Sequence, residues 1–165
     1  MIAQENSFQC IHCDKPVTEN RCIGTAHRNH CPFCLWSKHM DGEKPGDRLS
    51  GCNGDMKPIG LTFKHEGVDK YGKQKQGELM VIHSCKKCRK ININRIAGDD
   101  DEHALLTLLA FLNLSAIPAE TLSKIHLLGI TILDNQDAVE VQKQLFGIER
   151  AISVGRPLKG HPFSS

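Results

Sequence analysis

The apolar positions of this 165-residue chain follow two different patterns, and the change falls near Gly98. Before Gly98 the large apolar side chains are few and come in short runs, of which residues 57–64 and 78–83 are the clearest. A polar stretch that contains three glycines separates these two runs. Short apolar runs on either side of a glycine-containing polar segment predict the two strands of a β-hairpin.

After Gly98 the pattern becomes helical. Residues 103–114 are apolar on nearly every face, which indicates a helix buried on several sides. The acidic residues 99–102 directly precede this helix, and carboxylates there cap free amides and complement the helix dipole. Residues 118–128 open with a proline and are followed by a glycine, and residues 135–146 follow an aspartate and precede a glycine. These boundaries predict two further helices.

Composition changes at the same place as the apolar pattern. Residues 1–98 contain all eight cysteines, and residues 99–165 contain none. The first part has 16 Lys and Arg against 10 Asp and Glu, a balance of +6, and the second has 5 against 9, a balance of −4. We therefore predict a cysteine-rich domain at residues 1–98, a helical appendage at 99–150 and a flexible tail at 151–165.

Six of the cysteines form three C-x2-C knuckles, namely Cys10/Cys13, Cys31/Cys34 and Cys85/Cys88. The first ten residues show no basic segment followed by an apolar one, so we expect no secretory signal. The longest apolar run is far shorter than the roughly 20 residues of a membrane span, so we expect no membrane partner. In the cytoplasm, where we expect the protein, thiols stay reduced and paired cysteines favour zinc over disulfides.

Counting ligands extends the three knuckles to two sites. Six thiolates are too many for one tetrahedral zinc and two short of filling two. The best candidates for the remaining places are His39 and Cys52, because His39 lies close behind the second knuckle and Cys52 lies in a glycine-rich turn. We therefore predict two Zn2+ per chain, held by Cys10, Cys13, Cys31, Cys34, His39, Cys52, Cys85 and Cys88.

Spacing leaves the division of these ligands between the two sites open. We favour a nested arrangement, in which the first and last knuckles share one zinc and the second knuckle joins His39 and Cys52 around the other. A sequential arrangement, in which the first two knuckles share a zinc, has an equally familiar spacing. His30 and His83 are alternatives to His39, and Cys22 fits no paired spacing and is more consistent with a small buried hydrophobe.

The predicted fold is α+β: a zinc-ribbon-like module of short antiparallel strands with two metal sites, followed by two or three helices. The cysteine-rich part holds too few large apolar side chains to fold by hydrophobic burial alone. A structural zinc site contributes on the order of 10–16 kcal/mol and would make up this deficit.

Basic residues cluster in two places. Lys70, Lys73 and Lys75 lie in the polar stretch of the predicted hairpin, and Lys86, Lys87, Arg89 and Lys90 lie in and after the last knuckle. Clusters of this kind are typical of nucleic-acid-binding surfaces, and the alternative is a solubilising surface.

Two stretches resemble a known family. The first is R-N-H-C-P at residues 28–32, followed by C-L-x-S-x-H-x-D at 34–41 and P-G-D-R at 45–48; the second is H-x-C-x2-C at 83–88, continuing to N-R-I-A-G-D-D at 94–100. Together they resemble the RNHCP domain family over about residues 8–101, with Asp101 as a departure from an expected asparagine. The resemblance implies a small, cysteine-rich, zinc-binding domain and no particular activity.

Polar residues outside the ligand set have two interpretations. Arg28, Asp41, Asp47, Arg48 and Arg95 could form buried ion pairs that position loops around zinc. Alternatively, a polar cleft could form a hydrolytic centre from His27, His30, His39, Asp41, Asp47, His83, Asp99 and Asp100. Cysteine-rich zinc sites are usually closed, and no familiar hydrolase or deaminase motif is present, which argues against an enzyme.

The leading functional hypothesis is a non-enzymatic zinc-binding module that binds RNA or is ribosome-associated. This hypothesis depends on the basic clusters and on the frequent use of zinc ribbons in translation and transcription. The alternative is a protein-interaction adaptor, or a self-associating protein, that uses the leucine-rich helix beginning at Ala104 and ending at Leu114. A metal-dependent hydrolase or nuclease is the third hypothesis.

Overall fold

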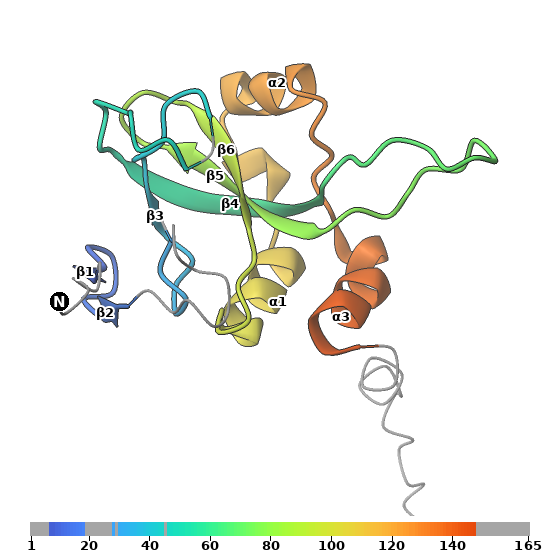
Figure 1. Ribbon diagram of the computed structural model, residues 1–165, viewed down its shortest axis with the longest axis horizontal. Coiled ribbons are helices and arrows are strands. Elements are labelled where there is room, and N and C mark those ends of the chain that lie inside the picture. Colours follow the sequence, from blue (N-terminus) through green and yellow to red (C-terminus); the bar gives the residue numbers. More distant parts are fainter. Residues whose placement is uncertain (1–6, 19–27, 29, 45, 148–165) are drawn as a thin grey trace, which may run out of the picture.

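A computed structural model describes residues 7–18, 28, 30–44 and 46–147 (Figure 1). Its centre is an antiparallel sheet in the order β3-β4-β5-β6, formed by Ser37–Lys38, Asp55–Phe63, Leu79–Cys85 and Ile91–Arg95. A separate ladder joins β1 (Phe8–Gln9) to β2 (Pro16–Val17) at the N-terminal knuckle.

The predicted hairpin is confirmed, and it is the longest pairing in the sheet. Strands β4 and β5 pair from Met56↔Cys85 to Phe63↔Leu79, with a bulge between Pro58 and Gly60. The bulge accommodates Pro58, which has no backbone N–H to give to a regular ladder. Beyond the strands the connection continues as a narrow arm that extends away from the sheet (Figure 1).

Helices cover the sheet on both faces. Successive side chains of a strand point to opposite faces. Val81 packs in one buried cluster with side chains of α1 (Glu102–Ala110) and α3 (Ala138–Phe146). Its neighbour Ile82 packs in a second cluster with Ile125 of α2 (Ala119–Leu127). Figure 1 shows the same arrangement, with α2 on one side of the sheet and α1 and α3 on the other.

The three predicted helices are confirmed, with differences at their ends. Asp101 caps α1 by accepting a hydrogen bond from the Ala104 N–H, as the acidic run predicts. However, α1 ends at Ala110 instead of reaching Leu114. Asn113 accepts a hydrogen bond from Ser115 N–H and so starts a separate 3-10 turn, η2 (Leu114–Ala116). A similar turn, η3 (Asn135–Asp137), precedes α3.

The larger of these two clusters joins the sheet to α1 and α3. The cluster around Leu61 of β4 also contains Leu105 and Leu109 of α1 and Val141 of α3. After α2 the chain returns to the sheet, where Leu133 N–H donates to the Leu61 carbonyl at 2.9 Å.

The boundary at residue 98 stays a prediction, and the predicted tail at 151–165 lies outside the described residues. Among the described residues, no helix has both the length and the apolar character needed to cross a bilayer.

Candidate metal centres

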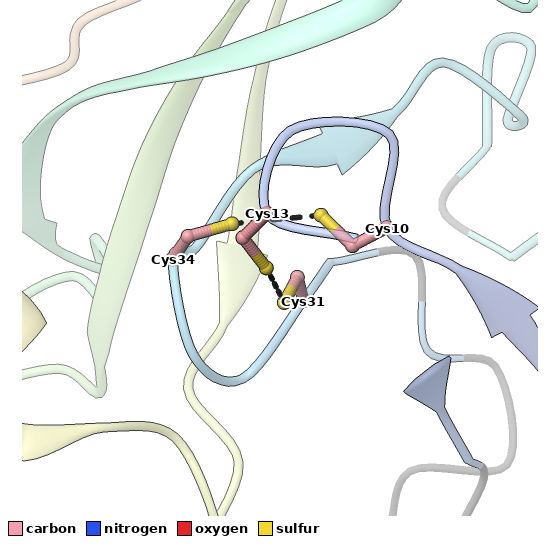
Figure 2. Close-up of side chains that lie close together, drawn as sticks. All are labelled: Cys10, Cys13, Cys31 and Cys34. Atoms are coloured by element: carbon pink, nitrogen blue, oxygen red, sulfur yellow. Dashed lines mark hydrogen bonds between the residues drawn. The ribbon is translucent and has the colours of Figure 1, made fainter. Parts of the chain in front are cut away.

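All eight predicted ligands lie in two compact groups. In centre 1, the thiols of Cys10, Cys13, Cys31 and Cys34 point toward one another from two loops (Figure 2). Centre 2 brings together His39, Cys52, Cys85 and Cys88. Within each group the candidate donor atoms all lie within 4.8 Å of one another.

The distances suit a tetrahedral ion. Zn–S bonds of about 2.3 Å place sulfurs about 3.8 Å apart at the corners of a tetrahedron. In centre 1 the Sγ–Sγ distances are 3.5 Å for Cys10–Cys34 and 3.6 Å for Cys13–Cys31. In centre 2, Cys52 and Cys85 are 3.7 Å apart. Each tetrad could therefore hold a metal ion.

The nested division of ligands is wrong, and the sequential one holds for centre 1. Strand register provides the physical reason. Lys38 of β3 pairs with Asp55, and Met56 pairs with Cys85, so the end of β3 and the last knuckle meet at the start of β4. His39 directly follows β3 and therefore joins the last knuckle. Cys31 and Cys34 precede β3 and face the N-terminal knuckle instead.

The three C-x2-C knuckles share one backbone geometry. In each, the N–H of the first cysteine donates to the carbonyl five residues later, and the residue after the second cysteine donates back to the carbonyl of the first. The first set of bonds ends on Lys15, Trp36 and Lys90 at 3.0, 2.8 and 2.9 Å. The residues that donate back, Asp14, Leu35 and Arg89, have φ values of 56°, 63° and 62°. This left-handed turn aims both thiols to the same side.

His39 and Cys52 form a fourth knuckle with an insertion. Asn53, directly after Cys52, donates to the His39 carbonyl at 3.2 Å, and the His39 N–H donates to the Gly54 carbonyl at 2.9 Å. Asn53 also has a φ of 50°, a conformation that asparagine tolerates well. These bonds match those of the short knuckles, so residues 40–51 are an insertion, here called the excursion, between two candidate ligands. Each centre therefore consists of two knuckles.

Two aspartates shape this excursion. Asp41 accepts hydrogen bonds from the backbone N–H groups of Gly46 and Arg48, at 2.8 and 3.2 Å. Asp47 accepts three, from Leu49, Gly42 and Lys44, and these bonds hold the pKa of its carboxyl below the usual value. These hydrogen bonds come from backbone amides, and the predicted ion pairs of the two aspartates stay a prediction.

Thiol chemistry also fits a cation in each centre. Burial raises the pKa of Cys34, and neighbouring thiols raise it further. Burial and neighbouring thiols act in the same way on Cys88. Cys13 and Cys52 are also desolvated, but hydrogen bonds from the backbone and from other thiols lower their pKa overall. The four crowded thiols of centre 1 and the three of centre 2 cannot all ionise unless positive charge compensates them, and a bound divalent cation would supply that charge.

His39 is the histidine that joins a tetrad. Its Nδ1 lies 3.2 Å from Cys88 Sγ. Burial lowers the pKa of its ring, as does nearby Lys90, so the neutral form that can bind a metal is favoured. Its Nε2 is buried without a hydrogen-bond partner among the described residues.

The alternative histidines have other partners. His83 is fully buried, and burial lowers its pKa to about 3, so the ring is neutral. Its Nε2–H donates to the Leu35 carbonyl at 2.6 Å, and its Nδ1 accepts from Asn94 at 3.0 Å. His30 Nε2–H donates to both carboxylate oxygens of Asp100, at 2.8 and 2.9 Å. Cys22 lies outside the described residues.

A buried ion-pair network connects centre 1 to the start of α1. Arg28 binds Asp99 through both terminal nitrogens and lies 3.7 Å from Asp100, which also binds His30. The Asp100 carboxylate accepts a further bond from Ala97 N–H. The predicted ion-pair role thus applies to Arg28, whereas the pair between Arg95 and Glu78 is exposed. His27, which belongs to the alternative hydrolytic set, lies outside the described residues.

The predicted nucleic-acid-binding residues lie at two opposite ends of the sheet. Lys70, Lys73 and Lys75 lie on the arm beyond β4 and β5, whereas the last knuckle follows the other end of β5 (Figure 1). Within that knuckle, Lys87 donates to the Cys52 carbonyl, and Lys90 donates to the Gly42 carbonyl. Lys86 and Arg89 are exposed.

An antiparallel sheet with three C-terminal helices and two Cys/His tetrads, each of which could hold a metal ion, defines a small α+β protein. The RNHCP domain model matches residues 5–106, which is more than half of the chain, so the chain belongs to the RNHCP domain family. A comparison with curated proteins finds no match, and a comparison with solved structures finds none either.

Proposed function

We propose that each tetrad binds one Zn2+ for a structural purpose and that the resulting module binds RNA, including RNA of the ribosome. The zinc assignment is supported by the donor sets, which are four cysteines in centre 1 and three cysteines with one histidine in centre 2. It is also supported by the tetrahedral spacing of the donor atoms. Four protein donors leave no open coordination position, which favours a structural ion over a catalytic one.

A pair of glycines offers a direct test of centre 2. A Cβ added at Gly54 would lie 2.8 Å from both Cys85 Sγ and Lys87 Cβ, whereas a Cβ at Gly51 would meet no described atom within 4 Å. We expect Gly54→Ala to lower the zinc content from two toward one per chain and Gly51→Ala to leave it unchanged. Metal analysis of the two purified variants measures this difference, and equal zinc contents would contradict the proposed geometry of centre 2.

The RNA proposal depends on how basic and aromatic side chains alternate on the surface near the two centres. Lys15 Nζ lies 4.4 Å from the centroid of the Phe33 ring, and Lys86 Nζ lies 5.7 Å from that of Trp36. The His12 ring stacks on Trp36, with centroids 4.3 Å apart and planes 11° apart. We call His12, Lys15, Phe33, Trp36 and Lys86 the aromatic–basic surface.

This combination matches the requirements of a single-stranded nucleic acid. Bases stack on aromatic rings regardless of sequence, while lysines contact phosphates. Lys87, Arg89 and Lys90 add positive charge at the same end of the sheet, and a lysine that donates to a carbonyl keeps its charge. The arm lysines Lys70, Lys73 and Lys75 would contact the same RNA only if the strand followed β5, which is about 20 Å long.

Salt dependence and matched variants test the RNA proposal. We expect zinc-loaded protein to bind single-stranded RNA with an affinity that falls steeply as salt rises. Lys86→Gln should weaken binding of all sequences and reduce the salt slope by about 1. Phe33→Ala should cost about 1–3 kcal/mol of stacking without changing that slope. Fluorescence anisotropy at several salt concentrations measures both effects.

Lys143→Gln is the matched control for the charge effect, because Lys143 lies on α3 and pairs with Glu140. Binding that is insensitive to salt, or that weakens equally in Lys86→Gln and Lys143→Gln, would contradict the proposal. Lys70→Gln tests the arm separately.

The adaptor alternative has one observation in its favour. Most leucines of α1 face the core, but Phe111 and Leu114 after its end are exposed, as are Leu127 and Leu128 at the end of α2. A protein partner that co-purifies in place of RNA, and whose binding requires these four side chains, would favour the adaptor.

A further inference from the structure

A cavity of about 620 Å³ lies beside the last knuckle. Its walls come from the first half of β4, the end of β5, the C-terminal part of α1, η2 and the start of α2. A volume of this size matches pockets that bind small organic ligands. Cys85 of centre 2 and the following residue, Lys86, contribute to its wall, whereas the other seven candidate metal ligands do not line it.

The charge of the cavity wall has one sign. Among the described residues, Lys57, Lys86 and Arg89 line it, and no aspartate or glutamate does. One of these cations, Arg89, interacts electrostatically with Glu120 of α2. Its pKa is lowered first by Lys124, which binds it at 2.8 Å, and also by Arg89. The cavity therefore favours a ligand that carries negative charge.

The rest of the cavity wall suits a flat ligand with some polar groups. Ile59, Leu108 and Leu112 provide apolar surface, while Asn113 and Thr107 are the polar residues beside them in the wall. Phe111 contributes an aromatic ring that is 80% exposed. An acyl chain would need a deeper apolar tunnel and would not use these polar groups, whereas a nucleobase uses an aromatic ring, an apolar floor and polar edge contacts together.

The position of Phe111 follows from how α1 ends. The helix stops at Ala110, and the Phe111 N–H closes the last turn by donating to the Thr107 carbonyl at 3.0 Å. Its side chain thus lies past the turn that packs Leu105 and Leu109 into the core. Phe111 therefore combines an exposed ring with a place in the cavity wall.

We propose that this cavity binds a nucleotide, with the base against Phe111 and the phosphate at Lys57, Lys86 and Arg89. A free mononucleotide carries such a base and phosphate, and so does a nucleotide within single-stranded RNA whose base is unstacked. Binding of a nucleotide within RNA rests on the proposed function. Lys86 connects the cavity to the aromatic–basic surface, because it belongs to both. Binding of a free nucleotide is independent of the proposed function.

The test uses the full zinc-loaded chain with three probes: AMP, adenosine and a single-stranded RNA oligomer. Phe111→Ala is expected to weaken binding of the probe that occupies the cavity, AMP or RNA, by about tenfold or more through lost stacking. Leu127→Ala is the matched control, because Leu127 is 87% exposed and does not line the cavity. Lys57→Gln should weaken AMP binding and leave adenosine binding unchanged. Titration calorimetry measures the affinities, and thermal unfolding confirms that each variant is folded.

The outcomes separate the two proposals. AMP binding that depends on Phe111 and Lys57, without RNA binding, supports the nucleotide cavity and overturns the RNA function. RNA binding that weakens in Phe111→Ala but not in Leu127→Ala identifies the RNA strand as the source. RNA binding that is unchanged in both Phe111→Ala and Lys57→Gln, together with no AMP binding, overturns the cavity proposal and leaves the RNA function standing. If neither AMP nor RNA binds, both are wrong.

Discussion

A Cys85→Ser variant is expected to retain one zinc ion per chain instead of two and to lose the cooperative unfolding transition of the native protein. Cys85 is fully buried, and its centre joins the ends of β3, β4 and β5. A structural zinc site contributes on the order of 10–16 kcal/mol, while a whole small domain is stable by only about 5–15 kcal/mol. Metal analysis and circular dichroism during heating measure the two effects.

Cys22→Ser is the control for this substitution, because Cys22 is the one cysteine outside the predicted ligand set. We expect it to keep two zinc ions and the native transition. If Cys85→Ser also kept both, the proposed assignment of centre 2 would fail, and a Cys22→Ser variant with only one zinc would point to a different ligand set.

An Asp100→Ala variant is expected to lose about 3–5 kcal/mol of unfolding free energy, the range for removing one partner of a buried ion pair. The Asp100 side chain is fully buried. The side chains of Arg28 and His30 are almost fully buried, at 1% and 6% exposure. Removing the carboxylate leaves two buried groups without this partner and frees the Ala97 N–H. Urea unfolding at constant zinc concentration measures the loss.

The neighbouring residue provides the comparison. Asp101 caps α1 from an exposed position, so Asp101→Ala should cost only about 1 kcal/mol. Similar losses for the two variants would mean that the network around Asp100 is not the main connection between centre 1 and α1.

Local patterns in the sequence predicted much of the fold. The hairpin and the three helices depend on short-range periodicity and on caps such as Asp101, which act within a few residues of one another. The eight candidate ligands could be chosen for a similar reason, since three of the four knuckles are read directly from C-x2-C spacing. His39 and Cys52 required ligand counting, because an excursion separates them.

Longer-range features could not be predicted in the same way. Which knuckles share a centre depends on the register Met56↔Cys85 and on β3 lying between Cys34 and His39, and no spacing encodes these pairings. Strand β6 alternates isoleucine with asparagine, a strand pattern that is easily overlooked beside a knuckle. The exposure of Phe111 depends on where α1 ends, and a competing Asn113 turn decides that.

The two centres differ in how much chain their candidate ligands enclose, and with zinc as the bound metal this difference would set an order of assembly. Centre 1 needs only residues 10–34, whereas centre 2 needs ligands from residue 39 to residue 88 with the whole β4–β5 hairpin between them. The shorter loop costs less entropy to close, so centre 1 can form on a nascent chain before β5 has been synthesised. A one-residue slip of β5 would turn Cys85 to the opposite face of the sheet. On the proposed zinc assignment, metal uptake at centre 2 would therefore select chains whose hairpin has already reached the correct register.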